Sequence, residues 1–216
     1  ELVSYEVGLK ADWLDGRLRT NVSAFNYQYD NLQVQKVVGA AVQVLNAASA
    51  EIRGIEAEFK ALPTDRIELG LDVSLLDSEY KDFSTSDPAR AELGVIDLSG
   101  NQLSQAPDYT ISASAQYTLP TTLGEFRFRA ESRWVDDVFF SPFNVVETSQ
   151  AANNKINFFV NYAHPDGRWT ASAFVRNLTD EDTVASSQVS ASLFAFPVLG
   201  ALEPPRTFGV ELGYSF

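Results

Sequence analysis

The sequence lacks several residue types on which common functions depend. It has no cysteine and no methionine among 216 residues, and it has one histidine. Without cysteine, disulfides, thiol catalysis and cysteine-based zinc sites are excluded. The net charge of −13 leaves no basic stripe that could neutralise phosphates, so we expect no nucleic-acid partner. No run approaches the ~18 apolar residues of a membrane helix, so any contact with a membrane must be made by strands.

Motifs for chemistry are scarce as well. The sequence has no phosphate-binding loop, dinucleotide fingerprint or metal-ligand triad. His164 lies in a turn beside Pro165, without the serine and aspartate partners of a catalytic triad. We therefore expect a protein that is not an enzyme, with no catalytic residues, no cofactor and no metal site.

What the sequence has instead is alternation. The chain closes on Phe208, Val210, Leu212, Tyr214 and Phe216, with small or charged residues between them. A period of two predicts a strand with one apolar and one polar face. The same pattern predicts an all-β protein of about nine strands, each about ten to twelve residues long. The pattern is clearest in the ranges 5–13, 18–29, 55–61, 67–75, 109–117, 126–134, 156–162, 169–175 and 208–216.

The alternation is interrupted at two places along the chain. In the second strand the apolar parity changes after Ala24, because Phe25, Tyr27 and Tyr29 fall on the other face. Either a bulge near Ala24 or aromatics turned to the polar side would explain the change. The small residues from about Gly39 to Asn46 predict a loop.

The connections favour a membrane barrel over a soluble sandwich. Short and long connections alternate along the chain, which puts all tight turns at one end of the strands, as in outer-membrane barrels. Several strands carry aromatics eight residues apart, for example Tyr5 and Trp13, which span roughly 20 Å along the axis of a tilted strand. Near the short turns the expected aromatic girdle is Trp13, Phe59, Tyr117, Phe126, Tyr162, Trp169 and Tyr214.

Nine strands cannot complete such a barrel. The first and last strands both run toward the short-turn end, so they would meet in parallel. An open sheet edge would expose backbone groups to lipid at several kcal/mol each. The chain also starts directly in a strand pattern, without a methionine or a secretory signal. We therefore expect residues 1–216 to be the C-terminal portion of a larger barrel, or to pair with another chain.

Four motifs resemble the barrel of TonB-dependent outer-membrane receptors. They are NAASAEIRGIEAEF (46–59), LSGNQLSQAPDY (98–109), RWTASAFVRNLTDE (168–181) and PRTFGVELGYSF (205–216). The resemblance implies an antiparallel 22-stranded transmembrane barrel in the outer membrane of a Gram-negative bacterium. It also implies import of a scarce nutrient, most often a ferric siderophore, with a plug domain and a TonB contact in a missing N-terminal region.

Candidate functional residues follow from the expected faces. Glu56 and Glu58 should face the lumen, where they contact a plug or ligand or form salt bridges within the wall. On another strand Arg127, Arg129 and Arg133 either bind an anionic substrate or pair with neighbouring acids. Two further sets are expected in loops: ligand-contacting or rim-anchoring aromatics (Phe139, Phe140, Phe143) and solvated acids (Asp82, Asp87, Glu92, Asp97).

The last strand has a second interpretation. Its apolar face should meet lipid and lipopolysaccharide, and a terminal Phe216 after alternating apolar residues resembles the signal read by the barrel assembly machinery. Three functions remain open: nutrient import as a TonB-dependent receptor of a small-molecule ligand, a passive porin-like barrel completed by a partner chain, and a soluble β-sandwich binding module.

Overall fold

The nine long strands form one antiparallel sheet. A computed structural model describes the chain except residues 39–40, 191–194 and 196. In 34–43, 45–48 and 88 the backbone is otherwise described but the side chains are not. The sheet order follows the chain: β1-β2-β3-β4-β7-β8-β11-β12-β15. The bounds are β1 Leu2–Trp13, β2 Leu18–Val38, β3 Ala41–Thr64, β4 Ile67–Asp82, β7 Tyr109–Thr121, β8 Gly124–Val135, β11 Asn153–Ala163, β12 Trp169–Arg176 and β15 Thr207–Tyr214. The predicted number of strands is confirmed.

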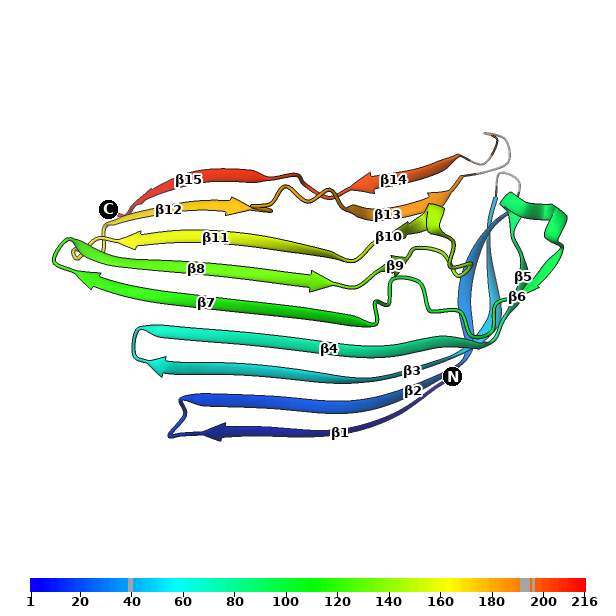
Figure 1. Cartoon of the computed structure of the whole chain (residues 1–216), viewed down its shortest axis with the longest axis horizontal. Coiled ribbons are helices and arrows are strands. Elements are labelled where there is room, and N and C mark those ends of the chain that lie inside the picture. The colour runs from blue at the N-terminus through cyan, green and yellow to red at the C-terminus, as the bar shows by residue number, and fades with distance from the viewer. Residues whose placement is uncertain (39–40, 191–194, 196) are drawn as a thin grey trace.

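Short turns and long connections lie at opposite ends of the sheet (Figure 1). The long connections hold three small strand pairs and two 3₁₀ turns. These are β5 Ser84–Ser86, η1 Pro88–Leu93, β6 Val95–Asp97, β9 Val138–Phe139, η2 Val146–Thr148, β10 Ser149–Gln150, β13 Val184–Val189 and β14 Val198–Leu202. Both β1 and β15 run toward the short-turn end, and no described residue pairs them, so the sheet is open as expected.

The register shows how strongly the strands are inclined. One row of paired residues crosses the whole sheet from Trp13, at the short-turn end of β1, to Phe208, six residues before the end of β15. The row is Trp13, Leu18, Ala61, Leu69, Ala115, Ala130, Phe158, Val175 and Phe208. Six residues rise ~20 Å while eight strand spacings cover ~38 Å, which gives a tilt of about 30°. Every member is apolar, so all nine strands present one continuous apolar face.

The parity change in β2 is not a bulge at Ala24. The register against β1 and β3 is unbroken from Leu18 to Tyr29, so Phe25 and its two aromatic neighbours turn to the polar face. The Phe25 ring lies over Gly54 of β3, where an added Cβ would be 2.7 Å from the ring Cζ. The irregularity comes later, between Tyr29 and Leu32. Aromatics fit this face because a glycine opposite makes room for the ring.

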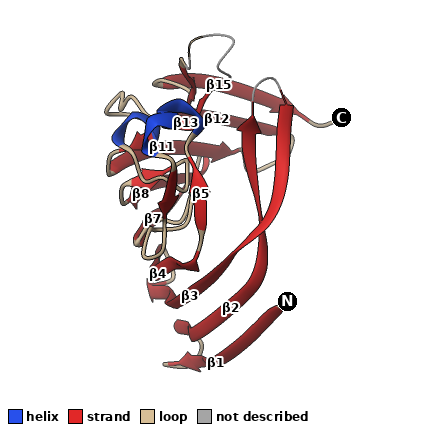
Figure 2. Ribbon diagram, turned by 90° about the vertical axis from the view of Figure 1, so that its right-hand side faces the viewer, coloured by secondary structure: helices blue, strands red, loops and turns tan. Residues whose placement is uncertain are grey.

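The strands at this edge of the sheet are longer than expected. β2 has 21 residues, β3 has 24 and β4 has 16. The expected loop at 39–46 is wrong for residues 41–46, which belong to β3, while 39–40 lie outside the described residues. Alternating valine in this segment favours extended backbone, which explains why small residues did not end the strand. Figure 2 shows the ends of β2 and β3 leaving the other strands and reaching toward the side of β15.

The buried core lies where β3 and β4 meet the long connections and not beneath the sheet. The described residues with buried hydrophobic side chains are Ala50, Tyr80, Phe83 and Leu98, at the long-connection end. On the sheet, by contrast, Phe208 is 80% exposed. A β-sandwich would cover that apolar face with a second sheet, and none of the described elements does so. Among the described residues, no helix is long and apolar enough to cross a membrane, a result that does not bear on crossing by strands.

Candidate functional site: the polar face and its loop-end cavity

The polar face of the sheet carries mostly paired charges. Glu58 accepts a hydrogen bond of 2.9 Å from the amide of Asn21, and Glu56 lies on the same face opposite Ser23 without a hydrogen bond among the described residues. Ion pairs join neighbours on this face, among them Arg19–Asp12 at 2.8 Å, Lys60–Glu68 at 2.9 Å and Arg129–Glu131 at 2.6 Å. Exposed pairs of this kind add ~0–1 kcal/mol each, so they keep the wall neutral more than they stabilise it.

The three arginines of β8 fall into two kinds. Arg127 pairs with Glu125 at 2.7 Å and Arg129 pairs with Glu131, as the interpretation of a solvated, neutralised wall expects. Arg133 lies on the same face nearer the end of the strand at the long connections, beside the cavity described below. It makes no hydrogen bond or ion pair in the described part of the chain, so of its two expected roles, pairing with neighbouring acids does not extend to it.

Aromatic side chains on the apolar face contact one another near the short turns. The ring centroids of Trp169 and Tyr214 are 4.6 Å apart, and those of Phe126 and Tyr162 are 4.8 Å apart. The last residue, Phe216, follows β15 and meets Tyr214 edge-on at 5.0 Å. The other members of the expected girdle (Trp13, Phe59, Tyr117) and the rest of the apolar face of β15 (Phe208, Val210, Leu212) are exposed. Such a band of amphipathic rings is typical of a membrane interface.

The single histidine is part of a short turn. The His164 Nδ1 lies 2.8 Å from Asp166 Oδ1, and the backbone N–H of Arg168, followed by the His164 contact, holds the pKa of Asp166 below its usual value. No group of three histidine or acidic residues that could bind a metal occurs among the described residues. The turn therefore shows local hydrogen bonding.

The long connections are held together by the buried cluster of Ala50, Tyr80, Phe83 and Leu98. Of the three loop aromatics expected to touch a ligand or the rim, Phe143 packs against this cluster. The Phe139 carbonyl accepts a 2.8 Å hydrogen bond from the Gln105 N–H, and Phe140 lines the cavity. All three side chains are half-buried.

The acidic loop residues differ in their surroundings. Asp87 is 6% exposed, accepts from the Ala89 N–H at 2.9 Å and pairs with Arg90, so its expected solvation is wrong. It caps the 3₁₀ turn η1, where its side-chain oxygen accepts from a backbone N–H that has no partner within the turn. Asp97 is exposed, and hydrogen bonds from the Ser99 hydroxyl and N–H lower its pKa. The other two acids of this set, Asp82 and Glu92, are exposed as expected.

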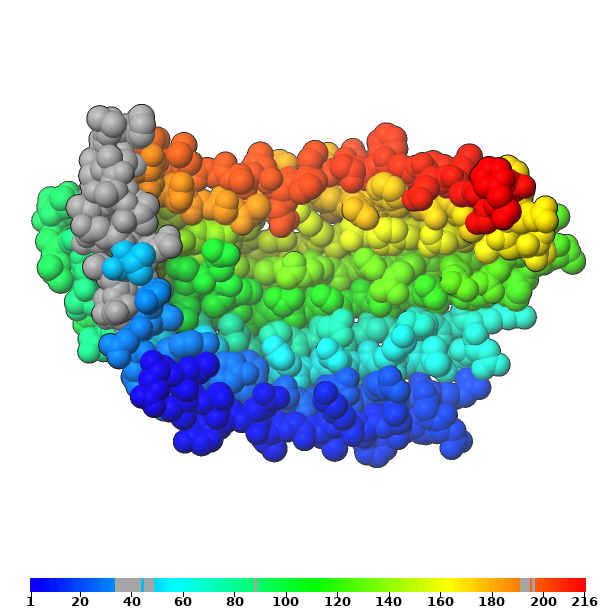
Figure 3. All heavy atoms as spheres, turned by 180° about the vertical axis from the view of Figure 1, so that it is seen from behind, coloured from blue at the N-terminus to red at the C-terminus, as the bar shows by residue number. Residues whose placement is uncertain are grey.

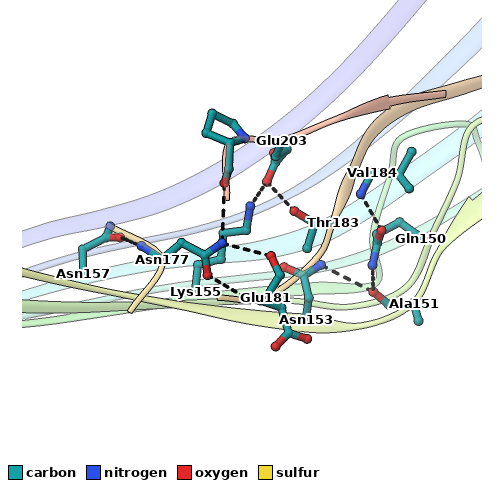
Figure 4. Close-up of polar contacts among 11 residues, drawn as sticks. Gln150, Ala151, Asn153, Lys155, Asn157, Asn177, Glu181, Thr183, Val184 and Glu203 are labelled. Carbon is teal, nitrogen blue, oxygen red and sulfur yellow. Dashed lines mark hydrogen bonds and ion pairs between the residues drawn. The ribbon is translucent and has the colours of Figure 1, made fainter. Parts of the chain in front are cut away.

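A cavity of about 130 Å³ opens at the long-connection end of the polar face. Lys155 of β11 forms an ion pair with Glu203, and the Thr183 hydroxyl donates to the same carboxylate at 2.9 Å (Figure 4). The Gln150 side-chain oxygen accepts from the Val184 N–H at 2.6 Å. The Lys155 pair binds the connection between β12 and β15 to the wall, and the Gln150 contact joins it to β10 in the connection before β11. They join residues up to 48 positions apart, so sequence reasoning had no local signal for them.

Asn177 fixes the start of this connection. Its backbone is in the left-handed region with φ of 52°, and its side-chain oxygen accepts from the Glu181 N–H at 2.8 Å. Its own N–H donates to the Asn157 side chain at 3.0 Å. Asparagine tolerates this conformation and caps turns of this kind, which explains its place in the motif RNLTDE. From the opposite side, Figure 3 shows a continuous surface from the β1 edge (blue) to the β15 edge (red).

The model of the β-barrel of TonB-dependent receptor-like proteins matches residues 2–178. The chain belongs to the TonB-dependent receptor family. Members are β-barrel proteins of the Gram-negative outer membrane, and the family consists of transporter receptors and not of enzymes. The apolar face of this receptor segment is therefore the outer face of a barrel, and the polar face is its inner wall.

Solved receptors share the fold. The ferric yersiniabactin uptake receptor FyuA of Yersinia pestis matches with a TM-score of 0.79 and 18% identity, over 100% of this chain and 30% of its own. The ferric preacinetobactin receptor BauA of Acinetobacter baumannii has a TM-score of 0.74 and 20% identity, over 100% and 29%. The ferric-catecholate import receptor Fiu of E. coli has 0.70 and 18%, over 100% and 27%. The chain thus spans about 30% of the length of the receptors that it matches.

Proposed function

We propose that residues 1–216 form the C-terminal part of the barrel of a receptor that imports a scarce nutrient, with a ferric siderophore as the favoured class. The observation that carries the proposal is the family membership together with three neighbours that are each named for a ferric chelate. A plug domain and a contact with TonB belong to the region before Glu1. Import then depends on the energised inner membrane through TonB. A passive barrel would need no contact with TonB.

The wall residues have distinct roles in this proposal. Glu56 has no hydrogen bond among the described residues, so we propose that it contacts the plug or the passing ligand. Glu58, Arg127 and Arg129 already have partners on the wall and serve to keep it neutral. Phe139, Phe140 and Phe143 are proposed to support the ligand-facing side of the loops. The outer face of β15 meets lipid and lipopolysaccharide, and Phe216 completes the signal for the barrel assembly machinery.

Iron uptake tests the proposal directly. Siderophores from an iron-limited culture of the source bacterium are loaded with radioactive iron and given to cells with and without this receptor. We expect uptake to fall by an order of magnitude or more in the receptor deletion and equally in a tonB deletion. Uptake that persists in both deletions would contradict the proposal. A leak of small solutes that needs the protein but not TonB would support the porin-like alternative.

A further inference from the structure

The cavity at the end of β8 and β11 contains a cation without a hydrogen bond or an ion pair among the described residues. Arg133 lines the cavity, and the described part of the chain offers its guanidinium no hydrogen bond or ion pair. Arg127 and Arg129 lie on the same face of the same strand, and both are paired with glutamates at 2.7 and 2.6 Å. Arg133 therefore differs from the two other arginines on its face of β8.

The charges around the cavity add up to an excess of one positive charge. Lys155 lies directly opposite Arg133 in the register of β8 and β11. Like charges in this position repel each other. Glu203 neutralises Lys155, and the hydrogen bond from Lys155 is the main reason that the pKa of Glu203 lies below its usual value, so the carboxylate stays ionised near neutral pH. Arg133 also attracts the Glu203 carboxylate electrostatically, but one negative charge cannot neutralise both cations, so one positive charge remains at the cavity in a chain whose net charge is −13.

The other polar groups of the cavity are already engaged. The Gln150 and Asn153 amides both donate to the Ala151 carbonyl, at 2.9 and 3.4 Å. The Thr183 hydroxyl donates to Glu203. The remaining lining is apolar: Val135, Val138, Phe140, Val184 and Ala185. A ligand entering this cavity therefore meets the guanidinium donors of Arg133, the paired charges of Lys155 and Glu203, and an apolar wall.

We propose that the cavity binds a carboxylate carried on a small apolar body, with Arg133 as the binding residue. The planar guanidinium matches the two oxygens of a carboxylate. Phosphate fits less well, because its further oxygens would face the apolar wall without partners. The volume of about 130 Å³ is close to the ~150 Å³ of an apolar cavity that accepts benzene. A role as a ligand subsite rests on the proposed import function, whereas binding of the carboxylate itself does not.

Fluorine NMR with 4-fluorobenzoate tests this site in the intact protein, purified in detergent at pH 7. We expect saturable binding that Arg133→Gln weakens tenfold or more, because the bidentate contact is lost. The matched control is Arg129→Gln, on the same face of β8 but already paired, which should change the affinity less than twofold. Fluorobenzyl alcohol, which has the ring without the charge, should not compete, and neither should inorganic phosphate.

Several outcomes would overturn the proposal. These are no saturable binding to the unchanged protein, equal binding by Arg133→Gln, and displacement of the probe by phosphate at equal concentration. If Arg133→Gln is not recovered from membranes, Arg133→Lys decides, since it keeps the charge and loses the planar fork; it should weaken binding threefold or more, and unchanged affinity would refute the assignment. If deleting the receptor leaves iron uptake unchanged while the purified protein binds fluorobenzoate as expected, the proposed nutrient is contradicted and the carboxylate site is not.

Discussion

Replacing Phe83 by alanine should loosen the long connections while leaving the sheet in place. The Phe83 side chain is 2% exposed and packs with Tyr80, whose ring centroid is 5.1 Å away, and with Leu98. These residues form the buried cluster described above, and it lies beyond the apolar face of the sheet. Removing the ring leaves a cavity in a cluster too small to be repacked from elsewhere.

The expected magnitude follows from the cost of such a cavity. Phe→Ala in a core costs ~3–5 kcal/mol. The loss falls on the local opening of the connection, because the sheet hydrogen bonds do not depend on this ring. Each 1.4 kcal/mol changes an equilibrium tenfold, so the opening constant should rise by at least a factor of about 100.

Two amide protons report that opening. The Leu98 N–H donates to the Phe83 carbonyl at 2.8 Å, and the Gly100 N–H donates to the Tyr80 carbonyl at 2.7 Å. Hydrogen exchange followed by mass spectrometry should show both becoming at least about 100-fold faster in Phe83→Ala. Peptides from β7 and β8 should exchange as before.

A control in the same connection separates this mechanism from general loop damage. Leu93 is 53% exposed at the end of η1 and lies outside the buried cluster. Leu93→Ala should leave exchange at Leu98 and Gly100 within about twofold, since an exposed side chain contributes little. Unchanged exchange in Phe83→Ala, or equal acceleration in both variants, would refute the idea that the cluster holds the connections.

Two further predictions concern the wall. Gly54→Ala should lower the free energy of unfolding by ~1–3 kcal/mol, because the new Cβ would lie 2.6 Å from the Leu75 carbonyl oxygen and 2.7 Å from the Phe25 ring. On a semi-native gel the folded band should be lost at a lower temperature. Gly8→Ala is the control, since its nearest contact is 3.2 Å, and an equal or larger fall in that temperature for Gly8→Ala would argue against the prediction. The Glu203 pKa is lowered chiefly by Lys155, so the stabilisation from this pair is present above the ordinary pKa of a glutamate and is lost as pH falls through the lowered value. Exchange in 177–206, corrected for intrinsic rates, should therefore rise below about pH 4, and Glu203→Gln should remove that rise.

The strands could be predicted from the sequence because each carries its own signal. A period of two over eight or more residues defines the faces of a strand, and tight turns such as the one at 164–168 fix where the next strand begins. Local patterns of this kind also determine the register, since a slip by one residue would turn a whole apolar face inward. Local signals of this kind are therefore enough to predict the order of the nine strands and the apolar face that contains the row from Trp13 to Phe208.

The cavity could not be predicted in this way, because its geometry depends on contacts between distant segments. Nothing near Lys155 in the sequence indicates that Glu203 neutralises it, and without that contact Arg133 looks like one more wall cation beside Arg127 and Arg129. The same holds for Phe83, which is buried by residues of three other segments although its own segment is polar. In this receptor, alternation encodes the wall, whereas the features that distinguish one part of the wall from another arise where the long connections fold back onto it.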